Sequence, residues 1–139
     1  MQPIIAGYSF EQHRVFSVAE LQELARLCGD SNPLHHDLKR AQASRFGGLI
    51  ASGSAISAVF SAMIPAHIGE QVPMLGLEMS FRFNAPVRPD VAIVLRWQVV
   101  EVQARKAQRS IATLQGEVRD GAQNLLIAGS AKIMLLAEL

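Results

Sequence analysis

Residues 54–64 read Ser54-Ala55-Ile56-Ser57-Ala58-Val59-Phe60-Ser61-Ala62-Met63-Ile64, a run in which no side chain is charged. A helix formed by this run has no polar face to present to water, so it must be buried on every side. Its alanines and serines would let a surrounding sheet come close to the helix backbone. Pro65 follows directly, and because proline cannot continue a helix we expect the helix to end there. The run therefore predicts a helix at the centre of the core.

The sequence after this helix predicts long strands. From Leu75 to Phe83, apolar side chains alternate with polar or small ones, which is the period-two pattern of a half-buried strand. Three more strands separated by turn signals are expected at residues 91–102, 110–118 and 125–136. Within the last of them, Gly129 marks a bulge or a close approach of backbone. Helices followed by strands that are joined by short turns indicate an α+β fold.

The sequence before the central helix predicts one strand and two further helices. Residues 8–15 are expected to form the strand. Ser17 and Glu20 have the spacing of a capping box, which predicts a helix over residues 18–28 that ends at the following glycine. A short helix is expected at residues 36–44. The chain has no repeat, linker or low-complexity segment, so residues 1–139 are expected to be a single domain.

A turn with chemically active side chains, Gly29-Asp30-Ser31-Asn32-Pro33-Leu34-His35-His36-Asp37, lies between the predicted helices. Pro33 cannot continue a helix and pushes Asn32 towards an extended backbone, which places Asp30 and His35 on an irregular, rigid turn. Two interpretations fit these residues. The acid and the imidazole act together as a general acid/base pair. Alternatively, Asp30 or Asn32 only caps the next helix, and His35 is a surface residue.

This turn resembles the signature G-D-x-N-P-x-H-x-D of the MaoC-like dehydratases and R-specific enoyl-CoA hydratases, and it matches at every fixed position. A second segment, Phe46-Gly47-Gly48-Leu49-Ile50-Ala51-Ser52-Gly53, resembles the lead-in to the central helix of that family. The resemblance extends from about Phe10 to Leu136. It implies the hot-dog fold, in which an antiparallel sheet wraps around one central helix, and residues 54–64 are the only segment suited to be that helix.

The resemblance also implies a reaction, the reversible hydration of a trans-2-enoyl thioester to an (R)-3-hydroxyacyl thioester. By motif position, Asp30 and His35 are then the catalytic pair, and an unperturbed imidazole near pH 6.5 suits the role of acid or of base. Gly53 lies at the expected start of the buried helix, where its free N–H group would bind the thioester oxygen as charge develops on it. The alternative is that residues 52–54 only cap and start that helix.

Three further residues belong to the expected binding site. Asn32 resembles the asparagine that fixes the family's turn, although a bond from its side chain to nearby backbone is the alternative. Ser61 matches a serine that is sometimes near the family's active site, and packing is its alternative role. Ser52 is the one departure from the family's pattern, because the family often has a histidine directly before the glycine at position 53. Serine also occurs there in related members, so activity is still expected, while the type of substrate is left open.

Composition excludes several other classes of protein. Half of the 139 residues are hydrophobic and the net charge is +1, which gives neither the profile of a disordered chain nor that of a nucleic-acid-binding protein. The amino terminus lacks the features of a signal peptide, and the longest apolar run is too short to span a membrane, so a cytoplasmic protein is expected.

No cofactor or metal is expected either. The four histidines lack the spacing of metal ligands, and the single cysteine, Cys28, is expected to be buried on the first helix. His13, His36 and His67 are expected to be exposed. Coenzyme A enters only as part of a thioester substrate, with candidate cations for its phosphates at Arg45, Arg82 and Arg88.

Two alternatives to the hydratase remain. The first is a hot-dog thioesterase, since one fold supports several chemistries. It is disfavoured because the turn matches the hydratase signature and the predicted central helix has no acid. The second is a non-catalytic subunit that binds acyl thioesters, on coenzyme A or on acyl carrier protein. A positive mean hydropathy of +0.21 and the resemblance both predict a homodimer.

Overall fold

The computed structural model describes residues 3–138, so residues 1, 2 and 139 of the expected single domain lie outside the described part. Strands and helices follow the predicted order, with the helices in the first half of the chain. Their bounds are β1 Ser9–Val15, α1 Val18–Leu27, α2 Pro33–His36, α3 Leu38–Ala43, α4 Gly53–Ile68, β2 Met74–Phe83, β3 Ala92–Ala104, β4 Ser110–Asp120 and β5 Leu125–Leu135.

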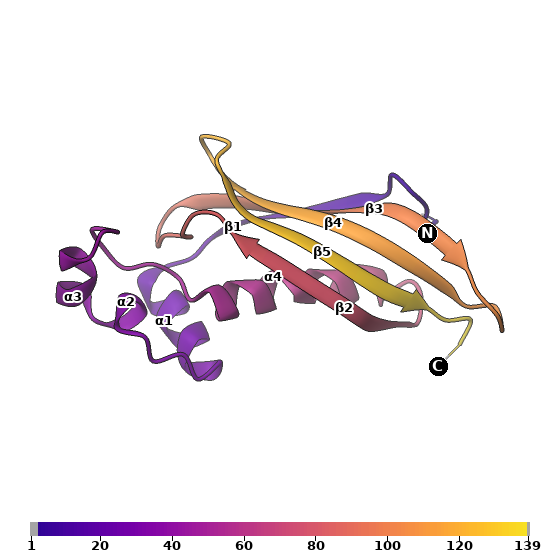
Figure 1. The fold of residues 1–139 in the computed structure, drawn as a ribbon, viewed down its shortest axis with the longest axis horizontal. Coiled ribbons are helices and arrows are strands. Elements are labelled where there is room, and N and C mark those ends of the chain that lie inside the picture. The colour runs from indigo at the N-terminus through magenta and orange to yellow at the C-terminus, as the bar shows by residue number, and fades with distance from the viewer. Residues whose placement is uncertain (1–2, 139) are drawn as a thin grey trace.

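The described strands form one antiparallel sheet in the order β1-β3-β4-β5-β2. The sheet curves over α4, which runs along its concave side, while α1, α2 and α3 gather at the end where α4 begins (Figure 1). This arrangement confirms the expected α+β fold with a sheet wrapped around a central helix. It also places the loops that enter and leave the short helices beside the first turn of α4.

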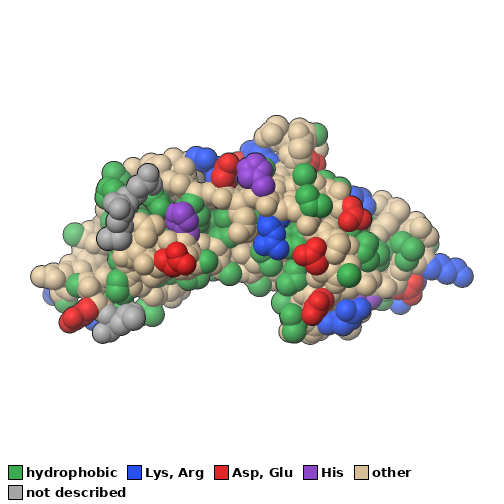
Figure 2. Space-filling model, turned by 180° about the vertical axis from the view of Figure 1, so that it is seen from behind, with side chains coloured by type: hydrophobic (Ala, Val, Ile, Leu, Met, Phe, Trp, Pro, Cys, Tyr) green, Lys and Arg blue, Asp and Glu red, His purple; other side chains and the backbone are tan. Residues whose placement is uncertain are grey.

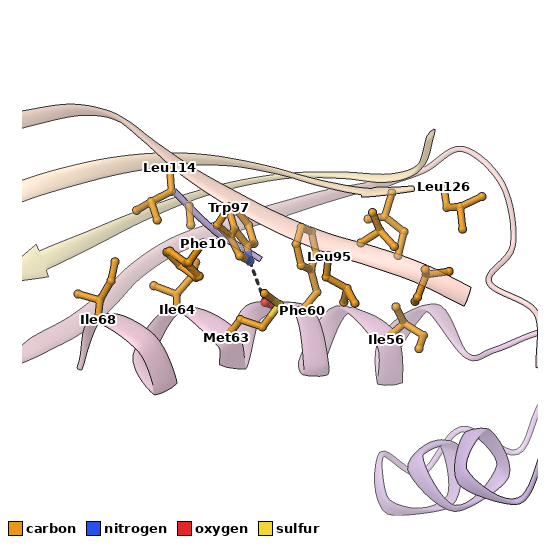
Figure 3. Packing of buried hydrophobic residues seen from close by; sticks show 14 of the residues in the cluster. Phe10, Ile56, Phe60, Met63, Ile64, Ile68, Leu95, Trp97, Leu114 and Leu126 are labelled. Atoms are coloured by element: carbon orange, nitrogen blue, oxygen red, sulfur yellow. Dashed lines mark hydrogen bonds between the residues drawn. The ribbon is translucent and has the colours of Figure 1, made fainter. Parts of the chain in front are cut away.

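The sheet and α4 are held together by a contact between Trp97 on β3 and Phe60 on α4. Their rings stack with centroids 4.3 Å apart, and the Trp97 indole Nε1 donates a hydrogen bond to the Phe60 carbonyl oxygen at 2.9 Å (Figure 3). Both side chains are fully buried. The bond satisfies the indole N–H, which a buried tryptophan requires.

Two glycines make room for this pair. Gly116 on β4 is paired with Trp97 on β3 and with Gly129 on β5, so the two glycines lie side by side under the stacked rings. A β-carbon built on Gly116 would be 2.6 Å from Trp97 Cε3, and one built on Gly129 would be 2.9 Å from Trp97 Cη2. The close approach that was predicted at Gly129 is confirmed, and Gly116 takes part in it.

The predicted end of the central helix at Pro65 is wrong. The helix α4 includes Pro65 and continues to Ile68, and the Gly69 N–H closes the last turn on the Pro65 carbonyl at 2.9 Å. Proline removes one hydrogen bond here, the bond to Ser61 one turn earlier. The final turn is kept because Ile68 is fully buried against the sheet, and that burial offsets the lost bond.

Two predictions near the first helix are also wrong. Cys28 is exposed, because the buried stripe of α1 consists of Leu21 and Ala25 and the helix ends in solvent. The segment after it is not an irregular turn throughout, since α2 forms one short helix with Pro33 as its first residue. A proline is tolerated there because the first helical N–H needs no partner within the helix.

The strand β2 is less buried than its alternating pattern predicts. It lies at the edge of the sheet and is paired only with β5 among the described strands. Leu75, Leu77 and Met79 are 53%, 46% and 41% exposed. The pattern correctly predicts a strand, but this chain does not supply the surface that would cover its apolar side.

Charges are mixed on the face of the molecule seen in Figure 2. Lysine and arginine side chains stand singly among acidic and apolar ones over the described residues on that face, and the surface is hollowed between the two ends (Figure 2). Together with the net charge of +1, this distribution does not match the clustered basic surface of nucleic-acid-binding proteins.

The glycine pair provides a test of the core. We expect Gly116→Ala and Gly129→Ala each to lower the free energy of unfolding by about 1–3 kcal/mol, because the added methyl group must displace Trp97 or Phe60. Gly76→Ala on β2 is the matched control, since a β-carbon there meets no atom within 4 Å. Urea unfolding measures all three. Equal stabilities of the Gly76 and Gly116 variants would contradict this account of the core.

Candidate active site

Asp30 follows directly after the end of α1. Gly29 takes a positive φ of +79° that turns the chain out of the helix, and the Asp30 N–H donates to the Ala25 carbonyl at 2.8 Å. On the other side, the His36 imidazole Nε2 donates to the Asp30 carbonyl at 2.8 Å. The backbone of Asp30 is therefore held at both its donor and its acceptor. The expectation that His36 is exposed is wrong, because this contact leaves it only half exposed.

His35 lies on α2 and is buried, with 6% of its surface exposed. Asn32 caps this helix, its side-chain oxygen accepting the Leu34 N–H at 3.1 Å. The His35 Nδ1 lies 2.9 Å from the Ile50 carbonyl oxygen. A carbonyl oxygen can only accept, so Nδ1 carries the proton in that bond. The nitrogen that is left to exchange a proton is Nε2, and it lies 3.1 Å from Asp30 Oδ2.

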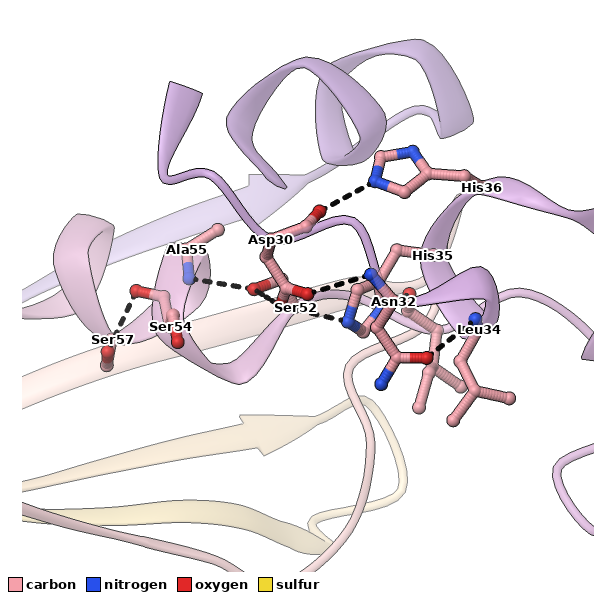
Figure 4. Close-up of polar contacts among 10 residues, drawn as sticks. Asp30, Asn32, Leu34, His35, His36, Ser52, Ser54, Ala55 and Ser57 are labelled. Atoms are coloured by element: carbon pink, nitrogen blue, oxygen red, sulfur yellow. Dashed lines mark hydrogen bonds and ion pairs between the residues drawn. The ribbon is translucent and has the colours of Figure 1, made fainter. Parts of the chain in front are cut away.

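Ser52 connects this pair to the central helix. Its hydroxyl donates to Asp30 Oδ2 at 2.6 Å and accepts the Ala55 N–H at 3.2 Å, which makes Ser52 the N-cap of α4 (Figure 4). Ser52 is fully buried. The pKa of Asp30 is lower than its ordinary value, mainly because its carboxylate accepts a hydrogen bond from the Ser52 hydroxyl. The Asn32 N–H and His35 lower this pKa further. Asp30 is therefore a carboxylate at neutral pH.

The pair faces a cavity of about 450 Å³ that opens at the end of the molecule where α4 begins. Its polar wall is made by the turn and by the start of α4. The rest of the lining, here called the apolar wall, comes from several segments. The apolar wall includes Leu34, Ile50, Ile56, Phe83, Val87 and Ile127. A cavity with a few polar groups at one end and an apolar remainder suits a substrate with a reactive head and an aliphatic chain.

Gly53 provides a backbone donor in the same cavity. It is the first residue of α4, and its N–H donates to no acceptor in the described part of the chain. The positive end of the helix dipole adds to the attraction for negative charge at this point. A β-carbon on Gly53 would lie 3.2 Å from the Phe83 ring, so glycine lets that ring close over the helix start. The N–H of Gly53 is thus beside both the polar and the apolar wall.

The structure brings together five of the six residues proposed for the site. Asp30, Asn32, His35, Ser52 and Gly53 all line the cavity. Ser61 lies two turns further along α4, is not among the lining residues, and donates its hydroxyl proton to the Ala58 carbonyl at 3.0 Å. For Ser52 and Asn32 the capping interpretation and the proposed site coincide, because each caps a helix and borders the cavity.

The sequence did not point to the apolar wall or to the Ile50 carbonyl. Phe83 ends β2, and nothing in its alternating pattern distinguishes it from Leu75 or Phe81. The Ile50 carbonyl is a backbone group, which carries no side-chain signal. Of the remaining histidines, His13 is exposed as expected, and His67 is exposed but stacks on Phe10 with ring centroids 4.3 Å apart.

Among residues 3–138, no three histidine, cysteine, aspartate or glutamate side chains are grouped as they would be around a metal ion. No helix in the same residues has the length and apolar character needed to cross a membrane.

Comparison with known proteins gives the family. The family model described as MaoC like domain matches residues 2–120, which is most of the chain. The chain belongs to the MaoC-like dehydratase family. Its five-stranded sheet around α4 is the hot-dog fold of this family, and membership makes it a hydro-lyase of the hydratase and dehydratase type.

Individual relatives of this MaoC-like chain are similar over nearly their whole length. An (R)-specific enoyl-CoA hydratase from Aeromonas caviae is 29% identical, over 96% of this chain and 97% of that protein. The solved structure of an (R)-hydratase from A. caviae involved in PHA biosynthesis superposes with a TM-score of 0.84, at 25% identity and with 98% and 99% of the two chains covered.

A third relative comes from another organism. The unliganded R-hydratase PhaJ1 from Pseudomonas aeruginosa superposes with a TM-score of 0.79, at 26% identity, with 96% of this chain and 83% of that chain covered. The fold and the order of its elements are thus shared along the chain, including the segments that carry the cavity.

The lowered pKa of Asp30 predicts how stability depends on pH. A carboxyl group whose pKa is lower in the folded protein stabilises the fold above its unfolded pKa of about 3.9, and this contribution is lost as the pH falls through the folded value. We expect the stability difference between wild type and Asp30→Asn, measured by urea unfolding, to shrink as the pH falls from 6 to below 3. Other acids cancel in this difference. A difference that is constant with pH would contradict the proposed contact with Ser52.

Proposed function

We propose that the protein is an (R)-specific enoyl-CoA hydratase, which adds water reversibly to a trans-2-enoyl thioester and yields an (R)-3-hydroxyacyl thioester. One observation carries the proposal: Asp30 Oδ2 and His35 Nε2 lie 3.1 Å apart on a cavity that also contains the start of α4. Hydration needs a proton acceptor, a proton donor and a site for negative charge in one place.

The proposed step balances with these groups alone. The water oxygen forms a bond to C3 while one of its protons passes to the pair of Asp30 and His35. The electron pair of the double bond moves to the thioester oxygen, which takes negative charge and accepts the N–H of Gly53. As the negative charge returns from that oxygen and the thioester carbonyl is restored, the electron pair forms the bond between C2 and a proton given by the same pair of residues. Attack and protonation come from one side because both groups lie on one wall of the cavity.

The thioester is the carrier of the acyl chain and no other cofactor is part of the proposal. Arg45 lines the cavity, which gives the cavity a cation, and its guanidinium lies 4.8 Å from the centroid of the Phe46 ring. This cation suits the phosphate groups of coenzyme A or of the arm of acyl carrier protein. We place the reaction in the cytoplasm, where an exposed thiol such as that of Cys28 stays reduced.

A direct assay tests the proposal. We expect crotonyl-CoA to lose its enoyl absorbance with wild-type protein, and Asp30→Asn and His35→Ala to lower kcat/KM by about 10²- to 10⁴-fold, the usual contribution of general acid–base catalysis. His13→Ala is the matched control, since His13 is an exposed histidine on β1 outside the cavity. Chiral analysis of the product should give the (R)-alcohol.

The two alternatives give different outcomes in the same assay. Release of free thiol without hydration would indicate a thioesterase, which α4 does not favour because it contains neither aspartate nor glutamate. Binding of the thioester with neither reaction would indicate a non-catalytic subunit. An unchanged rate in Asp30→Asn would contradict the assignment of the pair.

We also propose that the protein works as a homodimer in which a second copy covers β2. A ten-residue edge strand with exposed leucine and methionine side chains invites pairing or aggregation unless another surface covers it. Phe83, at the end of this strand, is 54% exposed and also lines the cavity. A second copy seated on β2 would therefore close one side of the acyl-binding wall.

Sedimentation analysis tests the dimer. We expect a dimer at micromolar concentration, and Leu77→Glu on β2 to shift it towards monomer, because a charge at this position would have to be desolvated in the interface. Val100→Glu on β3 is the control, since Val100 is similarly exposed at 41% but is not on the edge strand. A wild-type monomer, or equal effects of both variants, would contradict the proposed interface.

A further inference from the structure

We propose that Ser52 is a positioning residue for this reaction: its buried hydroxyl holds the Asp30 carboxylate against His35 and ties it to the first turn of α4. This inference rests on the proposed hydratase function and goes beyond it, since it assigns the geometry of the site to a side chain that takes no part in bond making. The hydroxyl oxygen lies 2.6 Å from Asp30 Oδ2.

The direction of the Ser52 proton is fixed by its surroundings. The hydroxyl has one proton to donate, and its oxygen already accepts the Ala55 N–H at 3.2 Å. With that N–H pointing at the oxygen, the proton must be donated to another acceptor, and Asp30 Oδ2 is the acceptor within reach. Because Ser52 is fully buried, water does not compete for this bond. The serine is thus a donor aimed permanently at the carboxylate.

This donor sets the rotation of the carboxylate. The last torsion of an aspartate side chain is soft, so the carboxylate turns unless its oxygens are held. Oδ1 accepts the Asn32 N–H at 3.1 Å, and Oδ2 accepts Ser52 and faces His35 Nε2. Two of the about four acceptor positions of the carboxylate are therefore filled by donors inside the protein, one on each oxygen. Removing the serine bond frees Oδ2 to turn away from the imidazole.

Ser52 also joins the two halves of the site. Its side chain holds the proton-transfer pair, and the next residue, Gly53, carries the N–H that receives charge from the thioester oxygen in the proposed reaction. As the N-cap of α4, Ser52 fixes the direction of that first turn as well. A single buried residue thus keeps the carboxylate in register with the start of the helix, and the reacting atoms of a substrate must span both.

The charges around Asp30 determine how loss of the Ser52 hydroxyl would change the pH profile. His35 faces the carboxylate from α2, His36 contacts its backbone, and Arg45 borders the same cavity. Arg26 on α1 borders the hollow on the other side of Asp30. These groups remain when Ser52 is replaced, while the strongest contact that lowers the Asp30 pKa is lost. The Asp30 pKa must then rise, and the acid limb of kcat/KM moves to higher pH.

Three variants separate positioning from helix capping. Ser52→Gly keeps a good N-cap residue and lacks the hydroxyl, Ser52→Thr keeps the hydroxyl, and Ser17→Ala removes a serine cap from α1 without touching the site. The experiment measures kcat, KM and the pH profile of each full-length variant with crotonyl-CoA, and also its thermal midpoint of unfolding. The Asp30 carboxyl is to be titrated by NMR in wild type, in Ser52→Gly and in Ser52→Thr.

We expect Ser52→Gly to lower kcat by about 10- to 100-fold with KM changed less than about threefold, as when a reacting group is slightly misplaced. Its acid limb moves to higher pH, and Ser52→Thr restores both properties. Ser17→Ala lowers the thermal midpoint and leaves the pH profile unchanged. A normal pH profile in Ser52→Gly, or a loss of kcat no larger than in Ser17→Ala, overturns the inference.

The NMR titration separates this inference from the proposed function. If wild type does not hydrate enoyl thioesters but the Asp30 titration moves to higher pH in Ser52→Gly, the hydratase proposal fails and the contact stands. If wild type is active and the titration does not move, the hydratase proposal stands and the role of Ser52 fails. A Ser52→Thr variant that folds but titrates like Ser52→Gly also contradicts the inference, because it keeps the hydroxyl.

Discussion

The rest of the structure depends on the packing of one side of α4, a helix without lysine, arginine, aspartate or glutamate, against the sheet. The sheet covers the side of α4 that carries Ile56, Phe60 and Ile64, which are buried. Ser54, Ala58 and Ala62 on the opposite side are exposed, so the expectation that this helix is buried on every side is wrong: the sheet of this chain reaches only one side of it. Trp97 and Phe60 fix the distance between the two layers, and Gly116 and Gly129 allow that distance to be short. Once α4 is fixed in this way, the position of its first turn is fixed too, and the site is built on that turn.

The first turn of α4 has backbone N–H groups without partners in the helix, and the site uses them. The first N–H groups of a helix have no partner inside it, and a buried helix start must satisfy them from elsewhere. The Ser52 hydroxyl accepts the Ala55 N–H, whereas the N–H of Gly53, a residue that lines the cavity, donates to no acceptor in the described part of the chain. The dipole of a sixteen-residue helix adds positive potential at the same place. An ionised Asp30 beside this end is therefore stabilised by the same feature that would attract a developing oxyanion.

Most of the helices and strands and the pair of Asp30 and His35 could be predicted from the sequence, and the wrong predictions share a cause. The capping box of Ser17, the strands with alternating side chains and the uncharged helix are local patterns, and each led to the right element. Pro65 was misjudged because the burial of Ile68 is a tertiary effect that no local pattern contains. The turn signature gave Asp30 and His35, but the Ile50 carbonyl that orients His35 is a backbone group from a distant segment.

The strand β2 shows a further limit of patterns. Alternating apolar side chains state that one face of a strand will be covered, but they do not state which molecule will cover it. In this chain Leu75, Leu77 and Met79 remain exposed on β2, which forms the edge of the sheet. The same strand ends at Phe83, whose ring lies 3.2 Å from where a β-carbon on Gly53 would be. A second copy that covered β2 as proposed would also contact Phe83, and this contact would link dimer formation to the shape of the cavity.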